Sequence, residues 1–494
     1  MFYRNTLKTE KTKQEEFEYS LFNSPLSTES DELQKTGSVK RTYNFLTEDG
    51  DLKTGYGFED IKMPTSFTDL DNESLISIRG DEVKAIWKMK WYDSQDDINC
   101  YYLFYYNDEG YICYDNIFRQ RLATFIVPND FTDIPYALYY RVEDEDMLLF
   151  FGEGQDLLTL TSLGSQTVEN VPVIKSCCAH YGKLFAITAT GNNQLVYTED
   201  LDITAWTDEK TKRLDFSDER GTLNKIISFD DYIYVFRDYG ITQLSIYGSN
   251  EDFSINHMYL SDSYIYPNTI AQSGDRVYFL ERYALKCFNG SSVSEVEIAC
   301  KDLISSCRQE NAYATCYEGK IYLACRCDFG DGESVGCESY SGGYKNNTLI
   351  IHDIESGYTE IVRGVDINQV LALNNPYKSK LVACFNGQYK GNIGQLTTDG
   401  KIFGSTLGGV WQSTDTDFGH HSKKKRIKSF TVKTSGDITV TISSDKMSKK
   451  FEVSGKANIQ KIRTNIVGNV FNVKITSGGE TTISNFVLFV SEKQ

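Results

Sequence analysis

Histidines, the residues best suited to acid–base or metal chemistry near neutral pH, number only five in this chain of 494 residues. His180 and His257 stand alone in strand-like sequence, a setting in which we interpret them as structural. His420 and His421 precede a run of lysines and are interpreted as part of a polar hinge. No Gly-x-Ser-x-Gly elbow, phosphate-binding loop or dinucleotide fingerprint occurs. The sequence therefore predicts a protein that is not an enzyme and needs no cofactor.

Four cysteines gather in one stretch of the chain, at Cys316, Cys325, Cys327 and Cys337. Thiolates are good zinc ligands, but zinc sites separate paired cysteines by two to four residues. A single residue separates Cys325 from Cys327, and both continue one apolar strand. We therefore expect buried, reduced cysteines and no metal.

The same region contains an acidic, glycine-rich segment, 328–333, whose carboxylates are of the kind that binds calcium. The segment lacks the regularly spaced ligands of an EF-hand loop. A solvated loop is the favoured interpretation.

The sharpest charged feature is the run Lys423-Lys424-Lys425-Arg426. Four adjacent cations are as consistent with a solvated linker as with a surface that binds phosphates or an acidic neighbour. Later cations would reinforce the same surface if their strands are adjacent. The predicted interaction patch consists of Lys423, Lys424, Lys425, Arg426, Lys428, Lys449, Lys450, Lys461 and Arg463.

Charge is distributed unevenly along the chain. The formal net charge is −18, but residues 411–494 contain 14 Lys and Arg against 7 Asp and Glu, so residues 1–410 carry −25. An acidic body repels DNA held close to it, whereas a basic tail can meet an acidic protein or a phosphate backbone. No apolar run of about 18 residues occurs, so we expect a soluble protein without membrane insertion.

Apolar strand cores recur from about residue 82 to residue 409, and their starting positions are mostly 37 to 48 residues apart, with one gap of 60. A propeller blade of four short strands needs about 40 to 50 residues. Turn sequences such as Asp230-Asp231 and Glu318-Gly319 join neighbouring strands and tolerate positive φ. The predicted cores are 100–106, 147–151, 184–187, 232–236, 277–280, 321–324 and 381–385.

These patterns predict an all-β protein: a six- or seven-bladed β-propeller followed by a small C-terminal antiparallel β-sandwich. We expect an extended N-terminal arm at 1–45, the propeller at 46–410 and a basic sandwich at 411–494, where apolar residues alternate strongly. Such arms are either flexible or bound across a neighbour, and this one could complete the last blade. A multi-sheet sandwich remains the alternative fold.

Several segments resemble the tail hub, or packaged-DNA stabilisation, proteins of short-tailed bacteriophages. The similarity extends over most of the chain and rests on strand, turn and aromatic patterns rather than on catalytic signatures. It is carried by segments 43–45, 50–58, 202–207, 229–236, 242–248, 425–427, 462–463, 471–475 and 483–488.

The resemblance implies a structural protein of the virion tail, assembled in the cytoplasm of the bacterial host. It implies a homo-oligomeric ring below the portal and adaptor that helps to retain packaged DNA, which passes through the channel. The implied partners are the portal or adaptor, other tail proteins, and fibre or plug proteins.

Two other functions remain open at this point. A receptor- or carbohydrate-binding propeller would stack sugars on exposed aromatic side chains, for example Trp206 and Tyr239. A propeller glycoside hydrolase would need paired carboxylates, which so acidic a chain supplies by chance. The hydrolase is the least favoured function.

Overall fold

The protein is built almost entirely of β-strands. The computed structural model describes residues 16–20, 22, 39–61, 66–68, 75–77, 82–93, 98–115, 124–142, 145–161, 163–189, 193–198, 203, 206, 212–246, 253–373, 380–419 and 423–492. In these ranges the helical elements are α1 (Lys301–Ser305), η1 (Pro267–Thr269), η2 (Gly336–Ser339) and η3 (Gly387–Tyr389). None of them is long or apolar enough to cross a lipid bilayer.

The chain divides into two compact units. One, which we call the propeller unit, comprises residues 58–357 and 363–396, and the other, the terminal unit, comprises 1–57, 358–362 and 397–494. The propeller unit contains 28 Lys and Arg against 50 Asp and Glu, and the terminal unit contains 23 against 19. The acidic character of the chain is therefore concentrated in the propeller unit.

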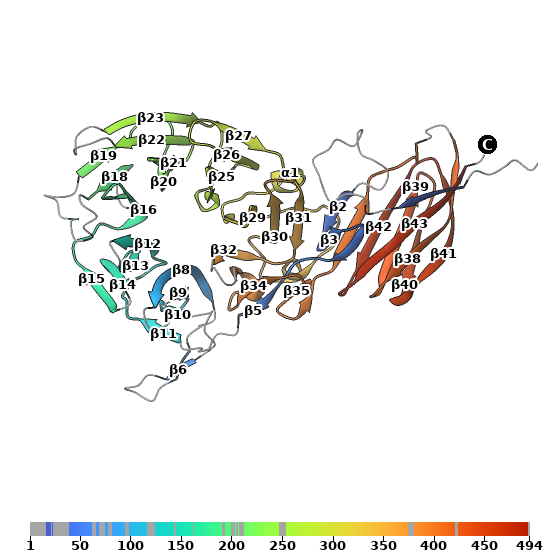
Figure 1. Cartoon of the computed structure of the whole chain (residues 1–494), viewed down its shortest axis with the longest axis horizontal. Coiled ribbons are helices and arrows are strands. Elements are labelled where there is room, and N and C mark those ends of the chain that lie inside the picture. Colours follow the sequence, from blue (N-terminus) through green and yellow to red (C-terminus); the bar gives the residue numbers. More distant parts are fainter. Residues whose placement is uncertain are drawn as a thin grey trace, which may run out of the picture. The chain divides into compact units, whose positions relative to one another are not determined.

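The propeller unit consists of antiparallel sheets that follow one another in chain order around a ring, as the series of colours in Figure 1 shows. The first four sheets each have four strands. They are β8 (Val83–Asp93), β9 (Ile98–Asn107), β10 (Ile112–Asp115) and β11 (Thr124–Val127); β12 (Tyr136–Val142), β13 (Glu145–Phe151), β14 (Leu157–Thr161) and β15 (Gly164–Val168); β16 (Ile174–His180), β17 (Lys183–Thr188), β18 (Gln194–Tyr197) and β19 (Lys212–Asp215); and β20 (Leu223–Phe229), β21 (Tyr232–Arg237), β22 (Gly240–Ile246) and β23 (Phe253–Leu260).

Three further sheets follow. They are β24 (Ala271–Ser273), β25 (Arg276–Glu281), β26 (Ala284–Phe288) and β27 (Val293–Val296); β28 (Tyr313–Tyr317), β29 (Lys320–Cys325) and β30 (Thr348–Asp353); and β32 (Ile367–Leu373), β33 (Lys380–Phe385) and β34 (Ile393–Thr397), beside which lies β5 (Gly57–Asp60). Strand β31 (Thr359–Arg363) belongs to the terminal unit except for Arg363. A separate pair, β6 (Ser66–Thr68) and β7 (Leu75–Ser77), also occurs.

A segment from early in the chain completes the seventh sheet. The N–H of Ile61, directly after β5, donates to the carbonyl oxygen of Ile393 on β34 at 2.9 Å. The ring of Phe58 lies 5.2 Å from the ring of Phe385 on β33. The sheet thus joins strands that are more than 300 residues apart in sequence, which closes the ring.

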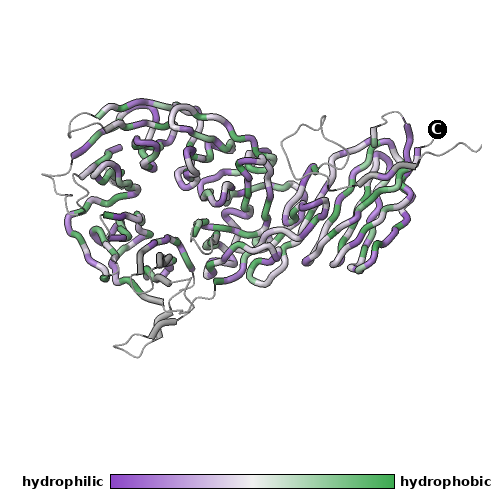
Figure 2. Tube along the Cα trace, in the orientation of Figure 1, coloured by the Kyte–Doolittle hydropathy of each residue, from purple (hydrophilic) through white to green (hydrophobic). Residues whose placement is uncertain are grey.

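All seven predicted strand cores are confirmed as strands, and each is the second strand of its sheet: β9, β13, β17, β21, β25, β29 and β33. These second strands are buried on both faces, as in β17, where every residue is buried. A strand enclosed on both sides reads as a continuous apolar run, so the sequence shows it clearly. Figure 2 shows hydrophobic segments recurring around the unit. The propeller-like, all-β prediction is therefore confirmed, and the multi-sheet sandwich is not supported for these residues.

Turn residues fix the register of these sheets. Asp230 and Asp231 both have positive φ, 46° and 62°, in the two-residue turn between β20 and β21. Glu318 and Gly319 do the same, at 47° and 73°, between β28 and β29. Positive φ at both central residues is the turn geometry that matches the twist of a hairpin. The turn interpretation of the sequence is confirmed at both positions.

The core of the propeller unit lies between neighbouring sheets. Between the third and fourth sheets, Phe185 and Leu195 pack with Ile226, Val235 and Leu244, and all five are buried. Similar clusters lie between the first and seventh sheets and between the fourth and fifth. Because each sheet buries both faces against its neighbours, no sheet of the ring folds independently of the others.

The terminal unit is a sandwich of two antiparallel sheets. Strands β43, β38 and β41 form one sheet with β3, β4 and β1, and strands β37, β42, β39 and β40 form the other with β2. Their bounds are β1 (Glu16–Ser20), β2 (Val39–Tyr43), β3 (Phe45–Glu48), β4 (Asp51–Thr54), β37 (Gly409–Ser413), β38 (Lys425–Thr434), β39 (Ile438–Ser444), β40 (Ser448–Val453), β41 (Lys456–Gly468), β42 (Phe471–Ser477) and β43 (Thr482–Glu492), with a small hairpin of β35 (Lys401–Ile402) and β36 (Ser405–Thr406).

Aromatic side chains fill the space between these two sheets. The ring of Phe430 on β38 stacks on Phe486 of β43 at 5.2 Å and meets Phe451 of β40 edge-on at 5.7 Å. Phe22, which follows β1, lies 5.0 Å from Trp411 of β37. The alternating apolar residues predicted at 426–490 therefore line the inner faces of both sheets.

The structure draws the domain boundaries differently from the prediction of an arm at 1–45, a propeller at 46–410 and a sandwich at 411–494. Strands β2 and β3, on either side of residue 44, pair with β37 and β4 of the terminal unit. Segments 46–57 and 397–410 also belong to this unit. Such pairings are long-range, and nothing in the local sequence distinguishes these strands from propeller strands.

Candidate interaction surface

The lysine-rich run does not form one continuous surface. It enters β38, where successive side chains point to opposite faces of the sheet. Lys425 is buried and its Nζ donates to the carbonyl oxygen of Lys423 at 3.2 Å. The Nζ of Lys423 forms an ion pair with the buried carboxylate of Glu492 at 3.0 Å. Lys424 is exposed and Arg426 half-buried, so the four cations do not form a single exposed patch, and their role in binding stays a prediction.

Some of the predicted cations do come together, on the outer face of the sheet formed by β38, β41 and β43. Arg463 on β41 lies opposite Ser429, and Lys461 lies opposite Thr431, whereas their neighbours Phe430 and Ile462 face inward. Phe489 of β43 also lies opposite Ser429 and shares the outer face. The Nζ of Lys461 lies 4.4 Å from the centre of the Phe489 ring, a cation–π contact.

We call this surface the basic aromatic face and define it by Arg426, Lys461, Arg463 and Phe489. Arg426 belongs to it because Ile427, the next residue on β38, is fully buried. Lys428 lies at an irregularity of the pairing and is half-buried beside it. Cations beside an aromatic ring can bind a carboxylate or a phosphate while the ring buries apolar surface.

Lys449 and Lys450 lie elsewhere, so the predicted reinforcement by them is not supported. Lys449 lies opposite the inward-facing Ile442, and its Nζ donates to the carbonyl oxygen of Thr464 on β41 at 3.0 Å. It therefore ties the two sheets together. Lys450 points to the outer face of the other sheet and forms an exposed ion pair with Glu452 at 2.9 Å. Lysines on an edge strand such as β40 also discourage edge-to-edge aggregation.

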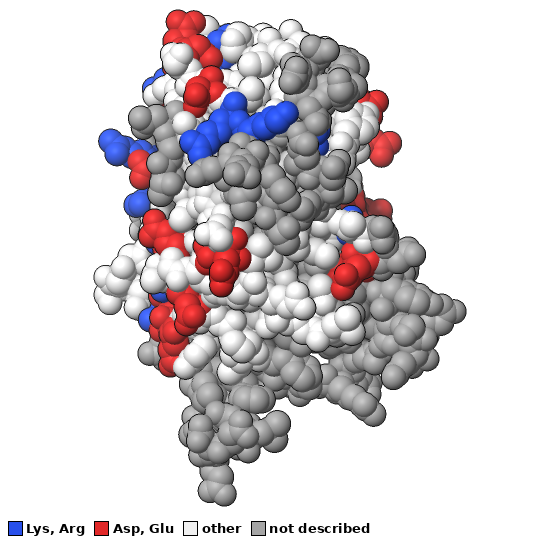
Figure 3. All heavy atoms as spheres, turned by 90° about the vertical axis from the view of Figure 1, so that its left-hand side faces the viewer, with Lys and Arg blue, Asp and Glu red and all other residues white. Residues whose placement is uncertain are grey.

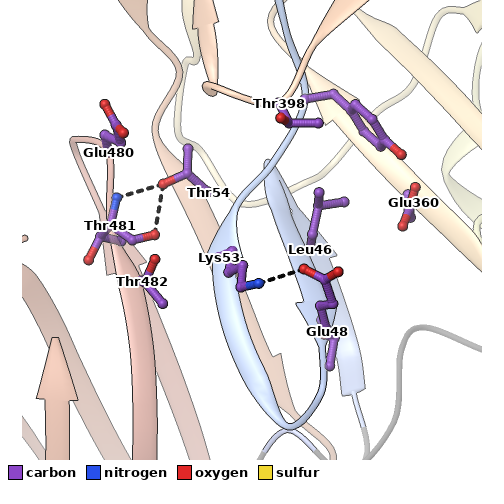
Figure 4. A pocket seen from close by; sticks show the side chains of 11 residues that line it. Leu46, Glu48, Lys53, Thr54, Glu360, Thr398, Glu480, Thr481 and Thr482 are labelled. Carbon is purple, nitrogen blue, oxygen red and sulfur yellow. Dashed lines mark hydrogen bonds and ion pairs between the residues drawn. The ribbon is translucent and has the colours of Figure 1, made fainter. Parts of the chain in front are cut away.

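A hollow of about 550 Å³ lies elsewhere in the terminal unit, beside the β3–β4 hairpin (Figure 4). Two sides of the hollow are linked by Thr54. The hydroxyl of Thr54 accepts from the N–H of Thr481 at 2.6 Å and donates to the carbonyl oxygen of Thr481 at 2.9 Å. Lys53 pairs with Glu48 at 2.6 Å, and this bond lowers the pKa of Glu48. The lining contains no histidine or cysteine.

The propeller unit contains most of the acidic residues of the chain. On the side that carries β15 and β19, Asp and Glu side chains gather in several separate clusters, and Lys and Arg side chains gather mainly in one band (Figure 3). This pattern agrees with the excess of acidic residues counted for the unit. A surface of this kind repels nucleic acid and attracts basic protein surfaces.

The cysteines of this region are mostly buried, and burial disfavours the thiolate form of Cys316 and Cys325. Cys325 and Cys327 are buried with their sulfur atoms 3.8 Å apart. Burial raises the pKa of Cys316 to about 12 and holds that of Cys325 well above its usual range. Among the residues that the structure describes, no three His, Cys, Asp or Glu side chains gather as a metal site.

The acidic loop at 328–333 is neutralised by an arginine. Arg363, which is buried, donates to Asp331 at 2.7 Å and forms an ion pair with Glu338 at 2.8 Å. Its guanidinium also lies 4.1 Å from the centre of the Phe329 ring. The arginine thus supplies positive charge to one carboxylate of the loop, Asp331, and to the nearby Glu338. Sequence reasoning missed Arg363, because it lies 30 residues beyond the loop.

Two of the histidines in the described ranges, His180 and His257, lie within hydrogen-bonding distance of hydroxyl groups. The Nδ1 of His180 lies 2.8 Å from the hydroxyl of Ser228, and burial lowers the pKa of this histidine. His257 lies 3.5 Å from the hydroxyl of Thr242 on the adjacent strand. His420 and His421 lie outside the described residues.

The two aromatic residues predicted to be exposed, Trp206 and Tyr239, have different surroundings. Trp206 is 4% exposed and packs against Phe151, so it does not offer a surface for sugars. Tyr239 is exposed and meets Tyr264 edge-on at 6.3 Å, and Tyr264 meets Tyr266 at 5.2 Å. These three tyrosines, at the β21–β22 turn and the loop after β23, form an aromatic group in which Tyr239 and Tyr264 are exposed and Tyr266 is half-buried.

Comparisons with known proteins identify no family. No protein-family model matches the chain, and no curated protein is a match in sequence. Solved structures of propeller domains are similar in fold. They include virginiamycin B lyase of Staphylococcus aureus (11% identity, 63% of this chain, 99% of that chain, TM-score 0.40), the Pan2 WD40 domain of Neurospora crassa (12%, 70%, 95%, 0.40) and the Cps50 propeller domain of Myceliophteria thermophila (9%, 64%, 99%, 0.43). At these identities the likeness concerns the fold alone.

Proposed function

We propose that this protein is a structural subunit of a bacteriophage tail, with a seven-bladed propeller and a β-sandwich that carries both ends of the chain. Copies of it form a ring below the portal and adaptor, help to retain packaged DNA and provide attachment for fibres or a plug. The phage assignment rests on the sequence resemblance. The ring rests on the segregation of charge between the two units, which is the observation that carries the proposal.

Charge segregation suits a ring because identical copies that associate head to tail must bring two different patches together. The propeller unit has 22 more acidic than basic residues, whereas the terminal unit has 4 more basic than acidic residues and carries the basic aromatic face. Complementary charge of this kind sets the orientation of the copies and speeds their encounter.

Contacts between neighbouring sheets suit a part that carries mechanical load. The N–H of Ile226 on β20 donates to the hydroxyl of Ser176 on β16 at 3.1 Å. The Nζ of Lys225 donates to the carbonyl oxygen of Ile270, just before β24, at 2.9 Å. Side chains of one sheet thus satisfy main-chain groups of the next, which opposes separation of the sheets.

The test has two arms. Light scattering and electron microscopy of the full chain are expected to show a closed ring at low salt that weakens as ionic strength rises. The purified ring is also expected to bind the portal or adaptor encoded in the same genome. A chain that remains monomeric at all concentrations and binds neither would overturn the proposal.

A second candidate is a carbohydrate-binding propeller, and the group of Tyr239, Tyr264 and Tyr266 favours it. Exposed tyrosine rings stack on the apolar faces of sugars. A glycan array would separate the two functions, because a hub gives no selective binding. Selective binding that is lost in Tyr239→Ala and Tyr264→Ala, but kept in Tyr358→Ala, an exposed tyrosine elsewhere in the chain, would favour the carbohydrate-binding function.

A further inference from the structure

Residues 16–20 and 22, which we call the arm from here on, belong to the terminal unit. Strand β1 pairs antiparallel with β43, from Glu16 opposite Ser491 to Ser20 opposite Val487. Two residues beyond β1, Phe22 is 1% exposed, and its ring lies 5.0 Å from that of Trp411. The arm therefore contributes an edge strand and a core side chain.

The connection that follows the arm is much longer than the gap it has to bridge. Trp411, against which Phe22 packs, lies opposite Thr42 of β2, so the chain leaves the core and returns to it beside the same tryptophan. Packed sheets lie about 10 Å apart. Residues 23–38 make up the connection, and a chain of that length spans up to roughly 50 Å. Its composition, rich in Ser, Thr and acidic residues, is that of a linker.

We propose that the arm is exchanged between copies, so that in the assembled ring β1 of one copy pairs with β43 of a second copy and Phe22 packs against Trp411 of that second copy. Exchange of an identical element keeps every hydrogen bond and every packing contact of the arm. The free-energy difference between the two arrangements is then set by the linker and by the local concentration of neighbouring copies, which is high in a ring.

Charge favours the same site for an incoming arm. Glu18 is exposed and lies opposite Phe489 of the basic aromatic face. The Nζ of Lys461 lies over that ring, and Arg463 continues the row across β38. An acidic strand that approaches β43 is therefore attracted before its hydrogen bonds form.

The inference rests on the self-association in the proposed function, and a mixing experiment tests it separately. Chains with Glu18→Cys are mixed with chains with Phe489→Cys, assembled and oxidised. Directly opposed residues have Cα atoms about 4.5 to 5.5 Å apart, within the range of a disulfide. We expect covalent pairs of chains in the mixture and in neither population alone. A second pair, Glu16→Cys with Ser491→Cys, makes the same test away from the basic aromatic face.

A matched control uses the same strand. Lys53 on β4 lies opposite Thr482 of β43, and β4 follows β3 after a tight turn, so it is not expected to reach another copy. A mixture of Lys53→Cys and Thr482→Cys chains should give no covalent pairs.

Three outcomes would overturn the exchange. One is a ring of normal size in which neither arm mixture gives covalent pairs, which leaves the proposed function intact. Another is cross-linking of the control mixture to the same extent as the arm mixtures. The third is absence of any ring, measured by light scattering before oxidation, which would overturn both the exchange and the ring.

Discussion

The side-chain amide of Gln369 binds both main-chain polar groups of Ile86. Its Oε1 accepts from the N–H of Ile86 at 3.0 Å, and its Nε2 donates to the carbonyl oxygen at 2.8 Å. Gln369 lies on β32 and Ile86 on β8, the first strands of the seventh and first sheets, so the amide takes the place of a partner strand where the ring closes. The same Nε2 also donates to the hydroxyl of Tyr313 at 3.0 Å.

Replacing Gln369 by alanine should weaken the closure of the ring. The change leaves the N–H and the carbonyl of Ile86 without their partner, so we expect the free energy of unfolding to fall by about 2 to 3 kcal/mol. Urea denaturation measures this loss. Gln272→Ala, at an exposed position of β24, is the matched control and should have little effect. An equal loss in both variants would contradict the special role of Gln369.

The pair of Arg237 and Asp218 predicts a dependence of stability on acid. Burial alone would raise the pKa of Asp218, but hydrogen bonds from Arg237, which is fully buried, outweigh it and hold the pKa at about 2. In the unfolded chain the carboxyl of Asp218 binds a proton more readily than in the folded protein. Its ion pair with Arg237 therefore stabilises the folded state fully above about pH 4, and this stabilisation is lost as the pH falls towards 2. The loss is about 2 kcal/mol.

Acid denaturation of Asp218→Asn checks this prediction. The variant should be less stable than the wild type at pH 6 and should lose less stability between pH 4 and pH 2. Asp275→Asn, at an exposed side chain, should follow the wild-type curve. Parallel curves for all three proteins would show that the Arg237 contact does not act in this way.

Reversing the charge of the basic aromatic face should disrupt assembly. In the double variant Lys461→Glu, Arg463→Glu, repulsion from acidic neighbours replaces attraction, so we expect at least a tenfold weaker association and a smaller dependence on salt. Sedimentation analysis measures both. Lys450→Glu, which reverses one charge on the outer face of the other sheet, should assemble normally. Normal assembly of the double variant would show that this face is not an assembly contact.

The Arg363 cluster should be insensitive to calcium and sensitive to loss of the arginine. Because Arg363 already neutralises Asp331 and Glu338, added calcium or a chelator should leave the melting temperature unchanged. Arg363→Ala leaves two carboxylates close together without a counter-charge and should cost about 3 to 5 kcal/mol. Thermal unfolding checks both statements. A calcium-dependent shift in the wild-type protein would contradict the first.

The buried cysteines should be unreactive while the protein is folded. Burial raises the pKa of Cys384 to about 12, so its thiolate, the reactive form, is scarce at pH 8. A thiol reagent should therefore modify most cysteines slowly, with the half-buried Cys307 among the first. In denaturant all 12 should react. Stability should also fall above about pH 9, because only the unfolded thiols ionise there.

Much of the propeller could be predicted from local sequence. A strand enclosed on both faces reads as a short apolar run, and β9, β17 and β21 were found in this way. The turns were equally visible, because residues such as Asp231 tolerate positive φ. The outer strands were less distinct, since β15 and β23 are largely exposed and alternate less regularly.

The candidate surface was predicted less well, for a reason that lies in the pleat of a strand. The run from Lys423 to Arg426 is continuous in sequence, but β38 sends Lys425 inward and Arg426 outward. Lys461 and Arg463 share a face with Arg426 because β41 pairs with β38. The register in which β38 pairs with β41 decides which side chains become neighbours. A single sequence does not give the register of two strands that are about 30 residues apart.

The sequence by itself determined the class of the fold, the position of the buried strands and turns, and the separation of acidic from basic segments, because periodicity and composition are local properties. Only the tertiary structure decided that β5 joins the seventh sheet, that β1 and Phe22 belong to the terminal unit, and that Arg363 occupies the acidic loop. Each of these depends on contacts between residues far apart in the chain, and such contacts form only where strand pairing and the burial of both sheet faces can be satisfied together.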